Sequence, residues 1–335
     1  MLWLVGLCLV YGSVGDVESW DLREDSGILF ERYVAHYNAQ FRDQQEREER
    51  FGVFQENLQT INQLNAQGKT KFGLNKFALL SKEEFRSQYL NLKTTPRSPN
   101  DPVAEEYSQQ QISAIPDEFD WVSKGAVTGV KDQGSCGSCW AFSATGNMEG
   151  QWFLAGHPLT SLSEQNLVDC DHECLDKNDC DQGCNGGLQP NAYNYVIKNG
   201  GIDTEASYPY EGIDDTCKFK STSVGAKISN WTFVPQDEAQ IAAYLVEHGP
   251  LAVAVEADVW QFYVGGVLYV PCGTTLDHGV LLVGYGVETD ILGQQMPYWT
   301  IKNSWGSSWG ESGYIYIERG TGLCGVNLYV TNSIV

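Results

Sequence analysis

The chain has 335 residues, which corresponds to two or three folding units at about 150 residues per domain. Hydrophobic residues make up 42% of the sequence and charged residues 19%, so the chain can bury a sizeable core and is neither disordered nor collagen-like. The formal net charge of −22 opposes attraction to a phosphate backbone, so we expect no nucleic acid partner.

The chain begins with an apolar tract, Leu2 to Val10, that small residues follow as far as Gly15. The tract is too short to span a bilayer, and its pattern is typical of a cleaved export signal. We therefore predict a signal peptide over residues 1–15, with a buried N-terminal strand as the alternative. No later segment has about 18 uninterrupted apolar residues, so we expect no membrane span after signal removal.

Residues 20 to about 92 are rich in Glu, Gln, Arg and aromatic residues, and their apolar positions recur at helical spacing. This spacing predicts two helices. The second would carry one apolar face made of Phe51, Phe54, Leu58, Ile61 and Leu64. Between Asn91 and Ala114 the sequence turns to prolines and polar residues, which predicts an exposed linker where proteases cut.

A second unit begins near Ile115, where Gly, Trp and Tyr become frequent, and it holds every cysteine except Cys8. It also carries most of the acidity, with a net charge of −18 against −4 for residues 1–114. Its first part has helix-like runs at residues 139–154, 164–170 and 189–199, and its later part alternates as strands do at 251–256, 280–285, 298–302 and 314–318. A helical half followed by a β half predicts an α+β fold with two lobes.

Nine cysteines remain after signal removal, which is an odd number. Four disulfides and one free thiol is the simplest arrangement in an oxidising compartment, and spacing alone leaves the pairing open. Cys136 and Cys139 could instead form a redox dithiol, and Cys174, Cys180 and Cys184 could contribute to a zinc site. Neither sequence context fits such motifs well, so we expect no metal and no cofactor.

The odd thiol is best placed at Cys139, which opens a predicted helix after a glycine-rich loop. Unpaired backbone N–H groups and the helix dipole would stabilise a thiolate there, which makes Cys139 a candidate nucleophile. Gln133 precedes it by six residues and offers an amide donor. His278 and Asn303 lie much later, each beside a predicted strand, and the combination of Cys, His and Asn indicates nucleophilic catalysis.

At these residues the sequence resembles the papain family of cysteine peptidases, in particular its cathepsin L-like branch. The matching stretches are Gln133–Phe142, Gly183–Gly187, Tyr208–Tyr210, Leu276–Gly279, Val283–Gly286 and Lys302–Gly306. In the first unit, the family's propeptide helix pattern is matched by Glu46, Arg50, Val53, Phe54, Asn57, Ile61 and Asn65. The resemblance implies a papain-like two-lobed fold over residues 114–335, preceded by an inhibitory helical propeptide over residues 16–113.

The resemblance also implies a role for each candidate residue. Cys139 would be the nucleophile, His278 the general base and acid, and Asn303 the residue that orients the imidazole. Gln133 would complete the oxyanion hole, and Trp305 would shield the Asn303–His278 hydrogen bond from water. The substrates would be proteins and peptides, and the chain's own propeptide would run through the cleft backwards as an intramolecular inhibitor.

Substrate contacts follow from the same resemblance. Gly186 and Gly187 would pair with an extended substrate through their backbones, and Asp277 belongs to the matching stretch beside the catalytic histidine. The walls of the main specificity pocket would be Leu188, Ala254, Leu276 and Tyr329. Because this lining is apolar, we expect a preference for Leu, Val or an aromatic side chain.

The family's disulfides carry over as Cys136–Cys184, Cys170–Cys217 and Cys272–Cys324. Cys174 and Cys180 remain, and we predict a fourth, local bridge between them. Asn230 lies in an Asn-x-Thr sequon, which is a possible glycosylation site. Together with the export signal, it predicts the secretory pathway, ending in a lysosome-like acidic compartment or outside the cell. We expect a monomer.

One position departs from the family pattern. Leu79 stands where the second propeptide motif usually has Asp, so that position cannot sense acid by losing a charge. Activation by falling pH would then depend on other carboxylates.

Two other classes of function remain alternatives. A catalytically silent relative could act as a binding or inhibitory module, although Cys139, His278, Asn303 and Gln133 are all present. A redox or metal protein could use the cysteines.

Overall fold

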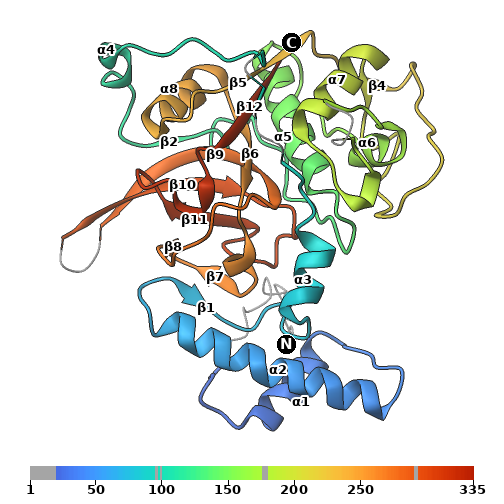
Figure 1. Ribbon diagram of the computed structural model, residues 1–335, viewed down its shortest axis with the longest axis vertical. Helices are drawn as coiled ribbons and strands as arrows, with labels where there is room; N and C mark the ends of the chain where they lie inside the picture. Colours follow the sequence, from blue (N-terminus) through green and yellow to red (C-terminus); the bar gives the residue numbers. More distant parts are fainter. Residues whose placement is uncertain (1–19, 95–96, 99, 176–179, 290–292) are drawn as a thin grey trace, which may run out of the picture.

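The computed structural model describes residues 20–94, 97–98, 100–175, 180–289 and 293–335, so the predicted signal peptide lies outside the described residues. Figure 1 shows two lobes side by side, one helical and one built on a β-sheet, with a helical N-terminal segment below them. This arrangement confirms the predicted α+β class. Among the described residues, no helix combines the length and apolarity needed to cross a membrane.

Within residues 20–92, all of which the structure describes, the N-terminal segment contains three helices where the sequence pattern predicted two. They are α1 (Ser26–His36), α2 (Gln44–Asn65) and α3 (Lys82–Tyr89). The third begins at a capping box, in which the Ser81 side chain accepts from the Glu84 N–H and the Glu84 side chain accepts from the Ser81 N–H. With only eight residues, α3 is too short to show a clear apolar periodicity, so the capping box is its main sequence signal.

The apolar face predicted for the second helix is confirmed, since Phe54, Leu58 and Ile61 are buried on α2. Arg50 on the same helix forms a two-pronged ion pair with Glu84 of α3, at 2.6 and 2.7 Å. It also donates to the Leu79 carbonyl at 3.0 Å. Leu79, which stands where the family usually has Asp, therefore contacts Arg50 through its backbone carbonyl. The carboxylate that pairs with Arg50 is that of Glu84.

The helical lobe contains the three predicted helices with the predicted bounds. They are α5 (Cys139–Leu154), α6 (Glu164–Cys170) and α7 (Gln189–Asn199). Helix α7 has a proline in its first turn and ends at Gly200 in the left-handed region, which are ordinary start and stop signals. A one-turn helix η1 (Gly183–Asn185) and a small sheet of β3 (Ile202–Asp203) and β4 (Val224–Ala226) complete this lobe.

The second lobe is built on an eight-stranded sheet within the described residues. Its main path runs β5-β12-β6-β9-β10-β11-β8, and β2 pairs with β9. The strands are β2 (Phe119–Asp120), β5 (Asn230–Phe233), β6 (Leu251–Val255), β8 (Val267–Leu268), β9 (His278–Thr289), β10 (Gln295–Lys302), β11 (Tyr314–Glu318) and β12 (Tyr329–Ile334). Helix α8 (Glu238–His248) and the one-turn helices η2 (Asp258–Trp260) and η3 (Leu323–Gly325) belong to the same lobe. Strands β6 and β9 are almost wholly buried, as expected for central strands.

The N-terminal segment is docked on the β lobe by backbone pairing at two places. Strand β1 (Lys71–Phe72) pairs with β7 (Tyr263–Gly265). The predicted linker also departs from expectation, because part of it adds to the edge of β5: Ala104 donates to the Phe233 carbonyl and Phe233 donates to the Pro102 carbonyl, both at 2.8 Å. An unpaired sheet edge offers donors and acceptors to any extended segment, which explains why this part is docked. Beyond it lies one short helix, α4 (Gln109–Ile112).

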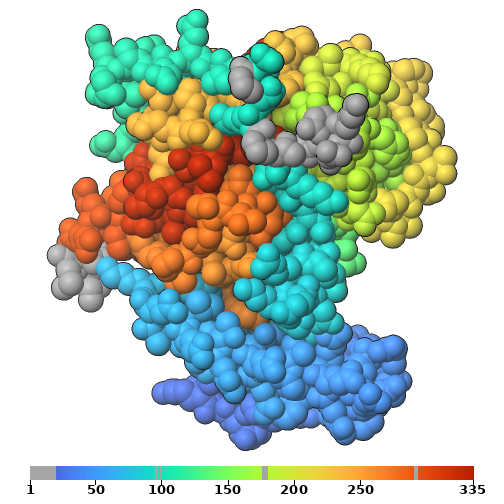
Figure 2. Space-filling model, in the orientation of Figure 1, coloured from blue at the N-terminus to red at the C-terminus, as the bar shows by residue number. Residues whose placement is uncertain are grey.

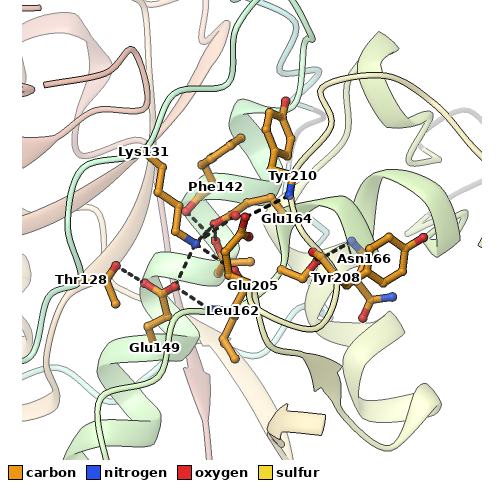
Figure 3. A network of polar contacts seen from close by, with 12 residues as sticks. Thr128, Lys131, Phe142, Glu149, Leu162, Glu164, Asn166, Glu205, Tyr208 and Tyr210 are labelled. Atoms are coloured by element: carbon orange, nitrogen blue, oxygen red, sulfur yellow. Dashed lines mark hydrogen bonds and ion pairs between the residues drawn. The ribbon is translucent and has the colours of Figure 1, made fainter. Parts of the chain in front are cut away.

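A buried polar network fixes the loop that leads into the site (Figure 3). The Lys131 ammonium group contacts the Glu164 carboxylate at 2.7 Å and the Glu149 carboxylate at 3.3 Å, and donates to the Leu162 carbonyl at 2.8 Å. Both carboxylates are almost fully buried, so the Lys131 cation that contacts them offsets part of a large desolvation cost, and the charge of the buried Lys302 also acts on both. This contact joins α5 and α6 to the segment that carries Gln133.

We expect replacement of Lys131 by Met to lower the free energy of unfolding by about 3–5 kcal/mol, because two buried carboxylates would lose the cation that contacts them directly. Lys124→Met, at an exposed position, should change it by less than about 0.5 kcal/mol. Urea unfolding of the unprocessed chain measures both values. A loss below about 1 kcal/mol for Lys131→Met would contradict the structural role given to this cation.

Candidate active site

The one free cysteine among the described residues is Cys139, at the first residue of α5. Its side chain is fully buried. The backbone N–H groups of Gly279, Asn91 and Trp140 act on its sulfur and favour the thiolate, but burial outweighs them and raises the pKa of Cys139 to about 11. The expectation of a thiolate stabilised by the helix start is thus not met while the site is covered.

His278 is the first residue of β9, and Asn303 follows the end of β10. The imidazole Nε2 and the Asn303 side-chain oxygen lie 2.8 Å apart. Trp305 stacks on the imidazole, with ring centroids 4.7 Å apart and an angle of 30° between the rings. Both rings are fully buried, so the hydrogen bond is shielded from water.

Burial lowers the pKa of His278 to about 4, although the Asn303 hydrogen bond and the facing Tyr89 carbonyl act in the opposite direction. Burial raises the pKa of the Cys139 thiol, which is the opposite direction. Around neutral pH both groups are therefore uncharged. The covered site holds the two reactive groups in a form without the ion pair that thiol catalysis needs.

Gln133 lies on the loop before α5 and is also fully buried. Its side-chain oxygen accepts from the Ser304 hydroxyl at 2.8 Å, which fixes the amide orientation. Its amide nitrogen donates to the Cys136 carbonyl at 3.1 Å and to the Tyr89 carbonyl at 3.4 Å. A backbone carbonyl of the N-terminal segment thus lies where the Gln133 donor is directed.

The N-terminal segment continues from Tyr89 across the line where the two lobes meet (Figure 2). The Leu92 N–H donates to the Asp277 carbonyl at 3.0 Å. Gly186 has a φ of 108°, and a Cβ there would lie 2.0 Å from the Asn91 carbonyl oxygen. Only glycine permits so close an approach of the segment to the helical lobe. No local sequence pattern predicts the role of Tyr89, Asn91 and Leu92, because backbone atoms make most of these contacts.

Leu92 is buried in the same apolar cluster as three of the predicted pocket residues, Leu188, Ala254 and Tyr329, and Leu276 packs against that cluster. Tyr329 pairs with Ala254 across β12 and β6, which brings two of the pocket residues together from opposite strands. Gly187 lies at the edge, where a Cβ would meet the Trp140 ring at 2.7 Å. Of the predicted substrate-contact residues, Gly186, Asp277 and Trp305 thus contact the N-terminal segment directly, and Leu188, Ala254 and Tyr329 share an apolar cluster with Leu92.

Leu188 is held by a buried pair of acids. The Asp181 carboxylate accepts from the Leu188 N–H at 2.8 Å and from the Asn191 amide at 2.9 Å. Asp171 lies beside Asp181, and burial raises the pKa of both carboxyls, that of Asp171 to about 6. Two neighbouring carboxyls in a dry site share a proton more readily than they carry two charges.

At the Trp305 end of the cleft, aromatic rings of the N-terminal segment cover the site. Phe77, Phe85 and Tyr89 contact the Trp305 ring edge-on, with centroids 5.4, 5.3 and 6.2 Å apart. The N-terminal segment therefore seals both the reactive pair and the ring that shields it.

The disulfides in the structure are Cys136–Cys184, Cys170–Cys217, Cys174–Cys180 and Cys272–Cys324. The first ties the loop before Cys139 to η1, next to Gly186. With Cys136 bonded to Cys184, the alternative dithiol of Cys136 and Cys139 does not form. The Asn230 side chain of the predicted glycosylation site is exposed.

Comparison with known proteins identifies the family. A family model described as papain family cysteine protease matches residues 115–334, which is more than half of the chain. The chain belongs to this family. A second model, described as a cathepsin propeptide inhibitor domain, matches residues 30–85. The papain-family resemblance of the sequence is thereby confirmed, and the chain carries its own inhibitory domain.

Individual relatives agree with this assignment. The chain is 54% identical over 297 residues to cysteine proteinase 1 of Dictyostelium discoideum, covering 86% of this chain and 87% of that protein. It is 47% identical over 310 residues to cysteine proteinase 15A of Pisum sativum, covering 90% and 85%. A recombinant stem bromelain precursor superposes with a TM-score of 0.82 at 34% identity, covering 92% of this chain and 99% of that one.

A digestive procathepsin L2 from the larval midgut of Tenebrio molitor has a TM-score of 0.81 and 34% identity, covering 93% of this chain and all of that one. This neighbour and the bromelain precursor are both proforms. The papain-family chain described here is accordingly a cysteine endopeptidase zymogen, and the alternatives of a silent module or a redox or metal protein are set aside.

The buried acids of this papain-family protein predict how its stability depends on pH. A carboxyl whose pKa is raised by folding binds its proton more tightly when folded, so the free energy of unfolding falls as pH rises from about 4 to 7. Asp171, Glu164 and Asp277, with folded pKa values of about 6, 7 and 7, titrate in this window. We expect the Cys139→Ser zymogen to have a higher melting temperature at pH 5 than at pH 8.

Asp181→Asn should flatten this dependence, because burial raises the pKa of the Asp181 carboxyl, whereas an amide binds no proton in this pH range. Differential scanning calorimetry from pH 5 to 8 provides the measurement, with Asp237→Asn on a helix cap as the matched control. A melting temperature that rises steadily from pH 5 to 8 in the Cys139→Ser zymogen would contradict the raised pKa values of these buried carboxyls.

Proposed function

We propose that Cys139, His278, Asn303 and Gln133 are the catalytic groups of this endopeptidase. The imidazole would take the thiol proton, and the thiolate would attack the substrate carbonyl carbon. The imidazolium would then give its proton to the departing amine, and water would release the acyl group from the sulfur. Asn303 is neutral, so it orients the ring without adding an anion that competes with the thiolate.

The position of Gln133 supports its role as the oxyanion donor. Its amide nitrogen is directed into the covered cleft and already meets a peptide carbonyl, that of Tyr89, at 3.4 Å. The Ser304 hydroxyl holds the amide in this orientation. A fixed donor costs no reorganisation when charge develops on the substrate oxygen, which is why such donors accelerate acyl transfer.

The main specificity pocket would take an apolar side chain from the residue that precedes the acyl residue. The zymogen supports this preference, because Leu92 is buried in the same apolar cluster as Leu188, Ala254 and Tyr329. The four residues proposed as walls of this pocket, Leu188, Ala254, Leu276 and Tyr329, are all uncharged, so they offer no ionic partner to a charged side chain. Leu, Val and aromatic residues are the expected guests.

Residues 16–113 would form the propeptide and residues 114–335 the mature enzyme, with processing before Ile115. The single observation that carries the proposal is the path of Tyr89, Asn91 and Leu92 across Cys139. From its N-terminal to its C-terminal end, the segment runs from the Trp305 end of the cleft to the apolar pocket. A substrate that places its acyl side in that pocket would run in the opposite direction. Protein and peptide substrates would follow the same cleft after processing. The enzyme would act as a monomer in a lysosome-like compartment or outside the cell. Disulfides persist in such oxidising surroundings, and the buried carboxyls with raised pKa values stabilise the fold in acid.

The test is a peptide-library cleavage profile of the processed enzyme together with two variants. Cys139→Ser should abolish turnover, and Gln133→Ala should lower kcat by about 10²–10³-fold through loss of one oxyanion donor. Alkylation of Cys139 should proceed normally in Gln133→Ala, which separates the oxyanion role from the nucleophile. Full activity of either variant would overturn the assignment, and a library preference for acidic or basic side chains in the pocket would overturn the proposed specificity.

The buried Leu92 also predicts a change in the strength of inhibition. Leu92→Asp should raise the activity of unprocessed zymogen toward a small peptide substrate by about 10- to 100-fold, since burial of a leucine contributes about 1.5–3 kcal/mol. Lys93→Asp, at the exposed neighbouring position, should leave zymogen activity at its basal level. Equal effects of the two variants would mean that charge, rather than occupation of the pocket, controls release.

A further inference from the structure

Three acidic side chains, Glu256, Asp258 and Asp277, lie together beside the catalytic histidine. One carboxylate oxygen of each lies within 4.8 Å of those of the others. The register of β6 and β9 pairs Val255 with His278, so Glu256 follows one strand where Asp277 precedes the other. We call these three residues the acidic cluster.

The acidic cluster has unused bonding capacity. Asp277 is only 9% exposed, and its Oδ2 has no hydrogen-bond partner. The Oδ1 of Asp258 is buried and also lacks a partner. Burial raises the pKa of Asp277 to about 7, and the charges of Glu256 and Asp258 act in the same direction. Buried carboxylate oxygens without partners are unfavourable, so the cluster is a site that a cation would stabilise.

In the zymogen the cations come from α3 of the N-terminal segment, which we also call the inhibitory segment. Arg86 contacts Asp258 Oδ2 at 2.7 Å, and Lys82 contacts the same oxygen at 3.2 Å. Asp258 is nearly buried, whereas both basic side chains are about half exposed. The inhibitory segment therefore places basic side chains at the acidic cluster in addition to placing Leu92 in the apolar pocket.

The cluster lies on the side of the cleft that would hold the leaving group. Along the inhibitory segment, Arg86 comes first, Tyr89 follows against Trp305, and Leu92 ends in the apolar pocket. If that pocket receives the acyl side of a substrate, the other end receives the residues after the scissile bond. The cluster is joined to the cleft because the Asp277 backbone carbonyl accepts from the Leu92 N–H at 3.0 Å.

We propose that Glu256, Asp258 and Asp277 form a cation-binding subsite that selects Arg or Lys on the leaving-group side of the scissile bond. This inference rests on the proposed function, because it uses the same cleft and direction. Removal of α3 would expose a cluster with a charge of up to −3 and two unpaired oxygens. A guanidinium group can donate a charge-assisted hydrogen bond to each of these two oxygens, whereas an apolar side chain would leave both without a partner.

The experiment compares two internally quenched peptides that differ only after the scissile bond, with Arg or Gln at the first and second positions. We expect processed wild-type enzyme to prefer the Arg peptide about 10- to 100-fold in kcat/KM, the range for a charge-assisted contact. The double variant Glu256→Gln with Asp258→Asn should bring the ratio close to one. Asp258→Lys should reverse the preference toward a Glu peptide.

A peptide amide of aminocoumarin, which has no residue after the scissile bond, is the control substrate. All variants should cleave it at the wild-type rate per titrated active site, and failure of wild-type enzyme on it would refute the proposed function instead. Glu288→Gln removes one exposed charge far along β9 and should keep the wild-type ratio. A wild-type ratio near one, or a ratio unchanged in the double variant, would overturn the subsite. A ratio that shifts with millimolar calcium chloride would overturn it in favour of a metal site.

Discussion

The close contact of α5 with β9 is the constraint on which the site depends. Cys139 begins the helix and His278 begins the strand, and they come from different lobes. The approach is close because glycines stand at the contact: a Cβ on Gly279 would lie 3.1 Å from the Cys139 carbonyl oxygen, and a Cβ on Gly146 would lie 3.0 Å from the Leu281 side chain. The Ser143 hydroxyl fixes the contact further by donating to the Val280 carbonyl at 2.7 Å.

Control of the enzyme follows from burial of this contact. The thiol and the imidazole have pKa shifts in opposite directions, and desolvation dominates both. Covering the cleft therefore does two things at once: it blocks substrate access and it withholds the ionised form of the nucleophile. Removal of the segment would uncover the cleft and reduce the part of the desolvation that the segment causes. The same segment is held by backbone pairing, an apolar anchor and ion pairs, so it can be released only as several contacts fail together.

Much of this could be predicted from the sequence, because the chemistry is carried by compact motifs. Helices 139–154, 164–170 and 189–199 and the central strands were predictable from local spacing and proline placement. The two-residue strand at Lys71 was not, since so short a segment has no periodicity and its pairing with β7 is decided by tertiary packing. The docking of Ala104 on β5 escaped prediction for the same reason.

The acidic cluster was equally invisible, because strand register alone unites Glu256 with Asp277. The raised pKa of Cys139 could not be foreseen either, since it depends on a distant segment that covers the helix start. Sequence patterns thus nominated the groups that we propose react, whereas the protonation state of those groups in the zymogen depends on burial.

The most direct test is the rate of Cys139 alkylation by iodoacetamide as a function of pH, before and after processing. We predict that the zymogen thiol reacts only at strongly alkaline pH, whereas the processed enzyme reacts in mild acid and loses that reactivity in His278→Ala. Identical pH profiles for the two forms would contradict it, because covering the cleft would then leave the ionisation of the nucleophile unchanged.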